Sequence, residues 1–139
     1  METLAQYHTI IGTTVARLFL GFLFFFQGYD AIFNIGMQKV VLTYRDGFGA
    51  KRIPRFLIVL AAWFTAYTEF ICGFLLIVGL FQFPAMYLLG LNLIVAAIGF
   101  GINLPLWDTR HVLPRLLLLL LLLLVPLGWH QWTIDYLIF

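Results

Sequence analysis

Four long apolar stretches dominate the sequence and limit the folds that it can adopt. They run approximately over residues 10–33, 56–81, 85–104 and 115–134. Each is long enough to cross a bilayer as a helix, which takes about 20 apolar residues, whereas barrel strands would alternate over about 10 positions. Hydrophobic residues make up 63% of the chain and charged residues only 10%, so most of its surface suits lipid. The sequence therefore predicts an all-α membrane protein.

The polar residues between these stretches predict how the helices are connected. Residues 82–84 leave room only for a tight turn, so the second and third helices should form an antiparallel hairpin. Residues 105–114 form another short link. In the longer first connection, about residues 34–55, apolar residues at helical spacing lie among charges, so we expect a short amphipathic interfacial helix there. The predicted architecture is a single domain, residues 1–139, built as an antiparallel bundle of four transmembrane helices.

Basic residues near the ends of the predicted helices favour one orientation in the membrane. Those in the first and third connections, on one side of the bundle, are Lys39, Arg45, Lys51, Arg52, Arg55, Arg110 and Arg115. The opposite side carries only Arg17. The positive-inside rule therefore places both long connections in the cytoplasm and both termini outside.

Composition also excludes several classes of site. Eight Lys and Arg residues and six Asp and Glu residues are too few and too scattered for a nucleic-acid surface. The single cysteine, Cys72, excludes an internal disulfide, a CxxC redox pair and a thiolate metal cage. The three histidines lie on different segments without the spacing of metal ligands, so we expect no metal or haem site.

Two ionisable residues, Arg17 and Glu69, lie deep inside the predicted helices, where such residues usually face the bundle interior and have a partner. Counted from the connection between their helices at about 1.5 Å per residue, they lie at about 24 Å and 20 Å, so we expect them to meet. Asn92 and His130 fall near the same level on the third and fourth helices. The sequence thus predicts an intramembrane polar cluster of Arg17, Glu69, Asn92 and His130.

The same residues have a purely structural interpretation, in which an Arg–Glu pair fixes the register of the bundle without any ligand. Small residues accompany the polar ones and should allow close helix packing; they are Gly21, Gly28, Gly73 and Gly99. Aromatic residues of the first two helices can line a slot for a flat ring or an acyl chain, although core packing or lipid exposure is the favoured explanation of these residues. This candidate ligand slot consists of Phe24, Gln27, Tyr67, Phe70 and Asn103.

Two segments carry a resemblance to a known family. The sequence RLFLGFLFFFQG, residues 17–28, resembles the first-helix pattern of the DoxX family: an arginine, a glycine four residues later, an apolar run and a final glycine. The sequence EFICGFLLIVGLF, residues 69–81, is similar to the second-helix pattern, a glutamate followed by spaced glycines and a short turn. Family members commonly have a histidine where Gln27 stands, so the resemblance does not carry a catalytic role to this position.

The resemblance implies a small four-helix membrane protein of quinone-linked redox systems, which include a subunit of thiosulfate:quinone oxidoreductase and components of oxidative-stress complexes. Our leading hypothesis is an accessory or structural subunit of a larger redox- or quinone-linked membrane complex, without independent catalytic activity. Its polar cluster would fix the bundle or hold a quinone or lipid headgroup. The alternative is a quinone-reactive oxidoreductase subunit that uses Glu69 for proton exchange, and a small transporter ranks third.

The expected surroundings follow from the same hypothesis. We expect a multi-pass protein of the bacterial inner (cytoplasmic) membrane. Its partners should be membrane lipid and either further copies of the chain or other membrane subunits, and no nucleic acid. A bound quinone or lipid is the only ligand that we expect.

Overall fold

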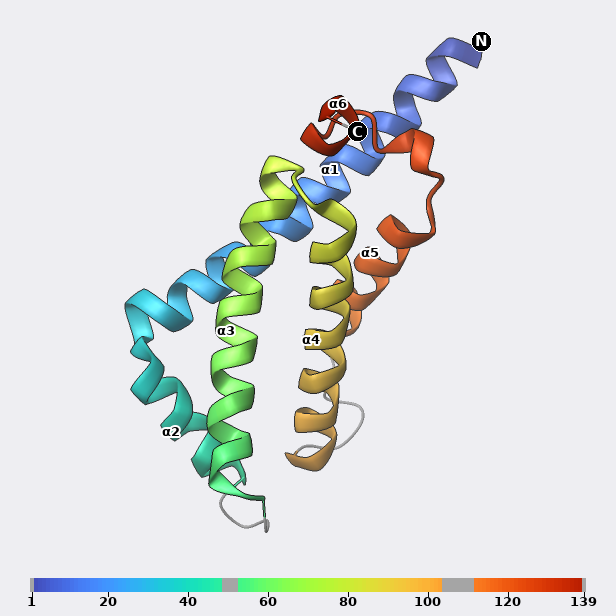
Figure 1. Ribbon diagram of the computed structural model, residues 1–139. Coiled ribbons are helices and arrows are strands. Elements are labelled where there is room, and N and C mark those ends of the chain that lie inside the picture. The colour runs from blue at the N-terminus through green and yellow to red at the C-terminus, as the bar shows by residue number, and fades with distance from the viewer. Residues whose placement is uncertain (1, 49–52, 104–111, 139) are drawn as a thin grey trace.

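The computed structural model describes residues 2–48, 53–103 and 112–138, without the side chains of Phe100 and Asn103. Within these ranges the chain forms helices and no strand, which confirms the predicted all-α fold (Figure 1). The elements are α1 (Glu2–Tyr29), the π-helix η1 (Asp30–Gly36), α2 (Met37–Phe48), α3 (Arg55–Val78), α4 (Gln82–Asn103), α5 (Leu113–Leu124), the 3₁₀-helix η3 (Leu127–Trp129) and α6 (Ile134–Ile138).

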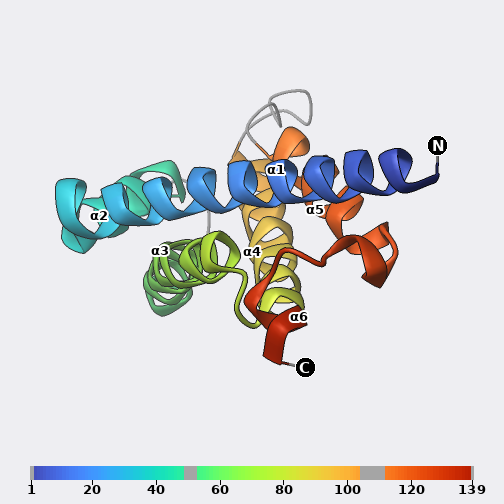
Figure 2. The same cartoon turned by 90° about the horizontal axis from the view of Figure 1, so that it is seen from above.

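The first long helix does not stop at the expected connection. α1, η1 and α2 follow one another without a break, so that Glu2–Phe48 forms one bent helical rod. α1 is tilted across α3 and α4, and α2 folds back along the start of α3 (Figures 1 and 2). On α2 the charged Lys39 and Arg45 are exposed, whereas Val40 and Tyr44 are half-buried. An amphipathic helix therefore occupies the predicted place between the first two long helices.

Glycines let α1 and α3 approach each other closely. A methyl group added at Gly73 would lie 2.8 Å from the Cα atom of Phe25 and 2.9 Å from the carbonyl oxygen of Gly21. At Gly28 it would lie 2.7 Å from the Cα atom of Phe70. These neighbours are backbone atoms that no side-chain rotation can move, so only glycine fits. This is the geometry of small-residue helix crossings in membranes.

The turn between α3 and α4 comes earlier than predicted. Gly79, with φ of 77°, ends α3 in the left-handed conformation, and its N–H donates to the carbonyl oxygen of Leu75 at 2.8 Å. Gln82 already belongs to α4, and Pro84 lies in the first turn of this helix, where the missing N–H has no helical partner to lose. The predicted turn at residues 82–84 is therefore wrong by about three residues.

The predicted fourth helix over residues 115–134 is also wrong. α5 ends at Leu124 because Val125 takes an extended conformation before Pro126, as residues that precede proline favour. The following residues form η3 and α6, which fold over the end of the molecule near the α3–α4 turn (Figure 1). Among the described residues, three helices are long and apolar enough to cross a membrane, and α5 is a shorter apolar helix.

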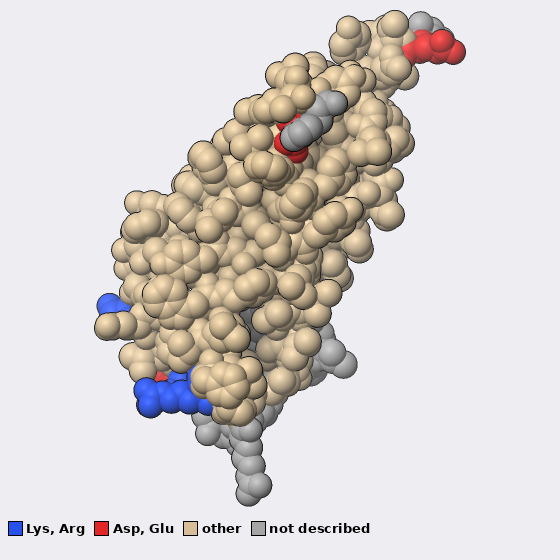
Figure 3. Space-filling model, viewed as in Figure 1, with Lys and Arg blue, Asp and Glu red and all other residues tan. Residues whose placement is uncertain are grey.

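The core lies between α1, α3, α4 and α5. Fully buried apolar side chains pack together there, among them Leu20, Phe24, Leu76, Met86 and Leu119. Large apolar side chains also cover the outside of these helices. On the face in Figure 3, charged side chains gather toward the two ends of the molecule and leave an uncharged middle. Such an uncharged band suits the hydrocarbon layer of a bilayer.

Candidate functional site

A buried carboxylate on α3 forms the centre of the candidate site. Glu69 is only 4% exposed, and its Oε1 atom accepts hydrogen bonds from Gln27 Nε2 of α1 and Asn92 Nδ2 of α4, both at 3.2 Å. The second atoms of both amide groups, Gln27 Oε1 and Asn92 Oδ1, are buried and have no hydrogen-bond partner among the described residues. Three helices thus meet at a cluster whose hydrogen-bonding capacity is only partly used.

Glu69 also lines a cavity of about 510 Å³, which we call the Glu69 cavity. Its apolar wall includes Leu23, Ile35 and Val40. Its polar wall consists of Gln27, Asp30, Thr43, Tyr44, Thr65, Glu69 and Arg115. The polar wall therefore offers hydroxyl groups, the two carboxylates of Asp30 and Glu69, and the guanidinium group of Arg115. The arrangement can hold the polar end of an amphipathic molecule, and the volume falls in the usual range for small-ligand pockets.

Arg17 forms a separate site near the C-terminal end of α3. Its guanidinium donates hydrogen bonds to the carbonyl oxygens of Leu76, of Ile77 at 3.3 Å, and of Trp132 at 3.1 Å. The last turn of a helix leaves carbonyl oxygens without helical partners and carries a partial negative charge, so a buried cation is favoured there. Arg17 therefore ties α1 to the end of α3 and to the C-terminal segment.

The predicted Arg17–Glu69 pair is not formed. Glu69 lies seven residues before Leu76 on α3, which is about 10 Å along the helix axis. The prediction assumed that residues 33 and 56 end the two helices at the same depth. Because α1 continues into η1 and crosses α3 at an angle, Arg17 lies beside Leu76, about one turn further along α3 than the assumed depths imply. At Gly28, which lies beside Phe70, the difference is about two and a half turns.

A family model described as DoxX matches residues 12–102, which extend from α1 to the last turn of α4. The chain belongs to the DoxX family. With its long apolar helices, it is a multi-pass membrane protein of this family. The matched region contains Arg17, Gln27, Glu69 and Asn92, whereas η3 and α6 follow it. Comparisons with curated proteins and with solved structures give no match.

His130 of this DoxX protein lies with the Arg17 site and not with Glu69. Its Nδ1 atom accepts a hydrogen bond from Gln82 Nε2 of α4, and its ring lies edge-on to Phe83 at 5.4 Å between centroids. His130 follows the membrane-spanning helices, and burial lowers the pKa of its imidazole from the ordinary value of 6.5. A hydrogen bond to the backbone of Leu122 opposes this lowering of the pKa, and the charge of Arg17 adds to it. The expected four-residue cluster is therefore two clusters at different depths.

The aromatic residues of the expected ligand slot do not converge. Phe24 is fully buried in the core, where the Arg115 guanidinium lies 5.8 Å from the centre of its ring. Tyr67 is 38% exposed and stacks on Trp63, and Phe70 stacks on Phe25. Of the proposed slot residues, Gln27 lines the Glu69 cavity, and the side chain of Asn103 lies outside the described part of the structure.

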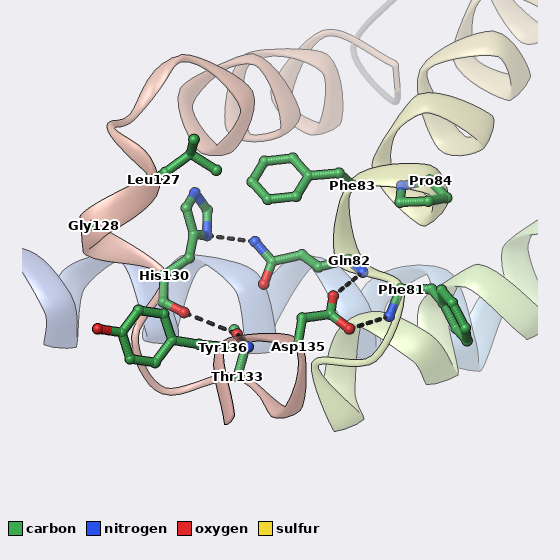
Figure 4. A pocket seen from close by; sticks show the side chains of 10 residues that line it. All are labelled: Phe81, Gln82, Phe83, Pro84, Leu127, Gly128, His130, Thr133, Asp135 and Tyr136. Atoms are coloured by element: carbon green, nitrogen blue, oxygen red, sulfur yellow. Dashed lines mark hydrogen bonds between the residues drawn. The ribbon is translucent and has the colours of Figure 1, made fainter. Parts of the chain in front are cut away.

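The sequence did not identify several residues near the two sites. Those that line the Glu69 cavity include Thr43, Tyr44, Thr65 and Arg115. The others, Asp135 and Gln82, lie near Arg17. Asp135, which the sequence places near the C-terminus, accepts hydrogen bonds from the backbone N–H groups of Phe81 and Gln82 at 2.8 and 2.6 Å (Figure 4). It caps α4 from a distant segment, which no local spacing reveals. Gln82 is 1% exposed, although its sequence position predicted a residue in an exposed turn. Gly99 was expected in close packing, but a methyl group added there would lie 3.5 Å from the Cζ atom of Phe48, which is an ordinary contact.

Proposed function

We propose that this DoxX protein is an accessory subunit of a larger redox- or quinone-linked membrane complex, and that it binds a quinone or a lipid headgroup in the Glu69 cavity. It has no independent catalytic activity in this proposal. The observation that carries the proposal is the Glu69 carboxylate, which is buried in the wall of a cavity of about 510 Å³. Ionisable residues buried at membrane depth usually mark ligand sites or relays.

The cavity lining favours a ligand with oxygen atoms on a flat or compact head. Arg115 supplies hydrogen-bond donors for a carbonyl or anionic oxygen, and the hydroxyl groups of Thr43, Tyr44 and Thr65 donate or accept. The amide oxygen of Gln27, which has no partner among the described residues, can accept a hydrogen bond from a hydroxyl or ammonium group of the ligand. The apolar wall then covers a ring or the start of an acyl chain. A quinone ring and a lipid headgroup share this chemistry.

The outer surface supports a partner within the membrane. Large apolar side chains project from α1 and α4, each with more than two fifths of its surface exposed. They include Phe19, Phe22 and Phe26 on α1 and Ile94 and Ile98 on α4. Lipid can cover such faces, and so can a second copy of the chain or another membrane subunit. Partners of this class fit the accessory role.

The proposed architecture is one domain, residues 1–139, arranged as a four-span antiparallel bundle whose fourth crossing includes α5. The start of α1 and α6 lie at the same end of the molecule, which supports termini on one side of the membrane (Figure 1). Exposed Lys39, Arg45 and Arg55 lie at the opposite end and favour the cytoplasmic side there. We place the protein in the bacterial inner membrane with both termini outside.

Analysis of co-purified small molecules tests the ligand. The full chain is extracted in mild detergent, and quinones and lipids that remain bound are quantified by mass spectrometry for the wild type, Tyr44→Phe and Tyr87→Phe. Tyr44 lines the Glu69 cavity, whereas Tyr87 is 64% exposed on the outside of α4, so the pair is a matched control. We expect one enriched quinone or lipid species, which Tyr44→Phe reduces several-fold and Tyr87→Phe leaves unchanged.

The results of this experiment distinguish a bound quinone from a bound lipid, and a second measurement tests whether the protein has a partner. An enriched quinone and an enriched lipid identify different occupants of the same cavity. Equal ligand content in both variants, or only the bulk lipid composition, would contradict the proposal. Native mass spectrometry of the same sample tests the accessory role, because a free monomer alone would contradict an assembly.

One observation favours a second function, in which the protein is a quinone-reactive subunit. Asp30 lines the same cavity as Glu69, so two carboxylates are available for proton exchange with a bound ring. In that case Glu69→Gln should abolish quinone reduction by the isolated complex while the circular dichroism of the helices stays unchanged. Wild-type turnover in this variant would exclude the second function.

A further inference from the structure

A groove on the outside of the molecule lies where α2 packs beside the start of α3. Its volume is about 300 Å³, and both helices contribute to its walls. The residues that line it are Met37, Gln38, Val41, Leu42, Arg45, Arg55 and Trp63. We call it the Arg45 groove. The Glu69 cavity meets a different face of α2, at Val40 and Tyr44, and the two share no residue.

Two arginine side chains from different helices line this groove. Arg45 belongs to the last turn of α2, and Arg55 is the first residue of α3. Asp46 follows Arg45 on α2 but is not among the residues that line the groove. A guanidinium group presents its N–H donors as a planar fork, which fits the oxygen atoms of a phosphate group. Two such groups at one groove favour a ligand that carries phosphate.

The aromatic side of the groove indicates its level in the bilayer. Trp63 is 44% exposed and stacks on Tyr67, with the ring centres 5.3 Å apart. Tryptophan and tyrosine are enriched where the hydrocarbon layer meets the headgroups. Lys and Arg side chains also gather at this end of the molecule (Figure 3). The groove therefore lies at the level of the lipid headgroups.

A second, apolar groove continues from the first along the outside of α3. It is lined by Arg55, Phe56, Val59, Leu60 and Trp63, so Arg55 and Trp63 belong to both grooves. The stretch from Arg55 to Trp63 rises about 12 Å along the helix axis, away from the end where the charges gather. A hydrocarbon chain can lie against this part of α3 while its polar head stays between the two arginines.

We propose that the Arg45 groove binds the phosphate headgroup of an anionic phospholipid, with one acyl chain in the apolar groove along α3. A zwitterionic phospholipid would bring its own positive charge close to Arg45 and Arg55, so charge favours a lipid with a net negative charge.

This lipid site is independent of the ligand proposed for the Glu69 cavity. Arg45 and Arg55 do not line that cavity, so failure of the lipid site would leave the other proposal untouched. Conversely, a lipid held in the Arg45 groove should be retained by Tyr44→Phe, because Tyr44 does not line the groove.

Quenching of Trp63 fluorescence by brominated lipids tests the proposal at the groove itself. The full chain is reconstituted in phosphatidylcholine vesicles, and a rising share of the lipid is replaced by brominated phosphatidylglycerol or brominated phosphatidylcholine. Because the chain contains four tryptophans, the Trp63 signal is taken as the difference between the wild type and Trp63→Phe. We expect an association constant about tenfold higher for phosphatidylglycerol, as charge-assisted hydrogen bonds to two arginines predict.

Three glutamine variants show whether the groove or the general charge of this end is responsible. Arg45→Gln and Arg55→Gln each remove one guanidinium group from the groove and should lower the preference for phosphatidylglycerol several-fold. Lys39→Gln removes the same charge from an exposed residue of α2 that does not line the groove, and it should leave the preference unchanged.

Each contrary result would overturn a stated part of the proposal. Equal association constants for the two lipids would mean that exchanging bulk lipid covers the groove. A loss of preference in Lys39→Gln as large as in Arg45→Gln and Arg55→Gln would overturn the assignment to the groove. Reversal of the additional quenching by millimolar inorganic phosphate would overturn the lipid, because a soluble anion would then be the occupant.

Discussion

Gly28→Ala tests how closely α1 and α3 pack. The added methyl group would lie 2.7 Å from the Cα atom of Phe70 and 2.8 Å from its Cβ atom. Carbon atoms prefer separations of about 3.5–4.0 Å, so the two helices must move apart by about 1 Å. The obstructing Cα atom belongs to a helix backbone, and rotation of a side chain cannot relieve the contact.

The size of the effect follows from two terms. Overpacking at a close helix contact costs about 1–3 kcal/mol. Gln27 adjoins Gly28, and its hydrogen bond to Glu69 is already 3.2 Å long, so a shift of this size breaks it. Loss of that bond adds about 0.5–1.5 kcal/mol. Alanine is also the better helix former, which offsets these two terms by up to about 1 kcal/mol, so we expect Gly28→Ala to lower the free energy of unfolding by about 1–3 kcal/mol.

Reversible unfolding in mixed micelles measures this change, with Gly12→Ala as the control. Gly12 lies on the same helix, and a methyl group there meets no atom within 4 Å. Alanine is also the better helix former, so the control should be neutral or stabilised by up to about 1 kcal/mol. Equal destabilisation by the two substitutions would refute the close-crossing argument.

Three further predictions concern the end of the molecule that carries the α3–α4 turn. Arg17→Met leaves the carbonyl groups at the end of α3 and at Trp132 without their donor, so thermal unfolding should show a loss of about 1–3 kcal/mol, with Arg17→Lys recovering part of it. Asp135→Asn weakens the cap of α4 and should cost about 0.5–2 kcal/mol, with faster hydrogen exchange at the Gln82 amide. Because the pKa of His130 is lowered in the folded state, its contribution to stability is complete above pH 6.5 and is lost as the pH falls toward the folded value. His130→Gln should remove this part of the pH dependence, which unfolding at pH 5 to 8 measures by difference.

Each of these predictions has a distinct contrary result. Wild-type stability in Arg17→Met would show that its hydrogen bonds do not hold the C-terminal segment. Unchanged exchange at the Gln82 amide would contradict the cap by Asp135. A stability that rises as the pH falls below 6.5, relative to His130→Gln, would mean that folding favours the charged imidazole.

Helix type and approximate position were predictable because they depend on local composition. The apolar stretches at residues 10–33, 56–81 and 85–104 correspond to α1, α3 and α4, with ends that differ by a few residues at most positions. The end of α5 was also encoded locally, since Pro126 disfavours a helical Val125. The prediction nevertheless extended the helix past Pro126, because the residues after it are also apolar and hydropathy alone does not distinguish one long helix from a short helix followed by other structure.

The pairing of polar residues was not predictable from depth alone. Counting along two helices requires their register, and here the register depends on where Gly28 and Gly73 let the backbones touch. Because α1 continues into η1, Arg17 lies at the end of α3 and donates to Leu76 there. Glu69 instead accepts hydrogen bonds from Gln27 and Asn92. The sequence thus identified Gln27, Glu69 and Asn92, whereas long-range tertiary contacts brought Tyr44 and Arg115 to the same cavity.

A density map of the full chain in lipid nanodiscs tests the central claim most directly. We expect density for a ring or a headgroup in the Glu69 cavity, within hydrogen-bond reach of Tyr44 or Arg115, and hydrogen bonds from Gln27 and Asn92 to Glu69. A cavity closed by α2 against α3, with no ligand density, would contradict it. An ion pair between Arg17 and Glu69 would contradict it as well.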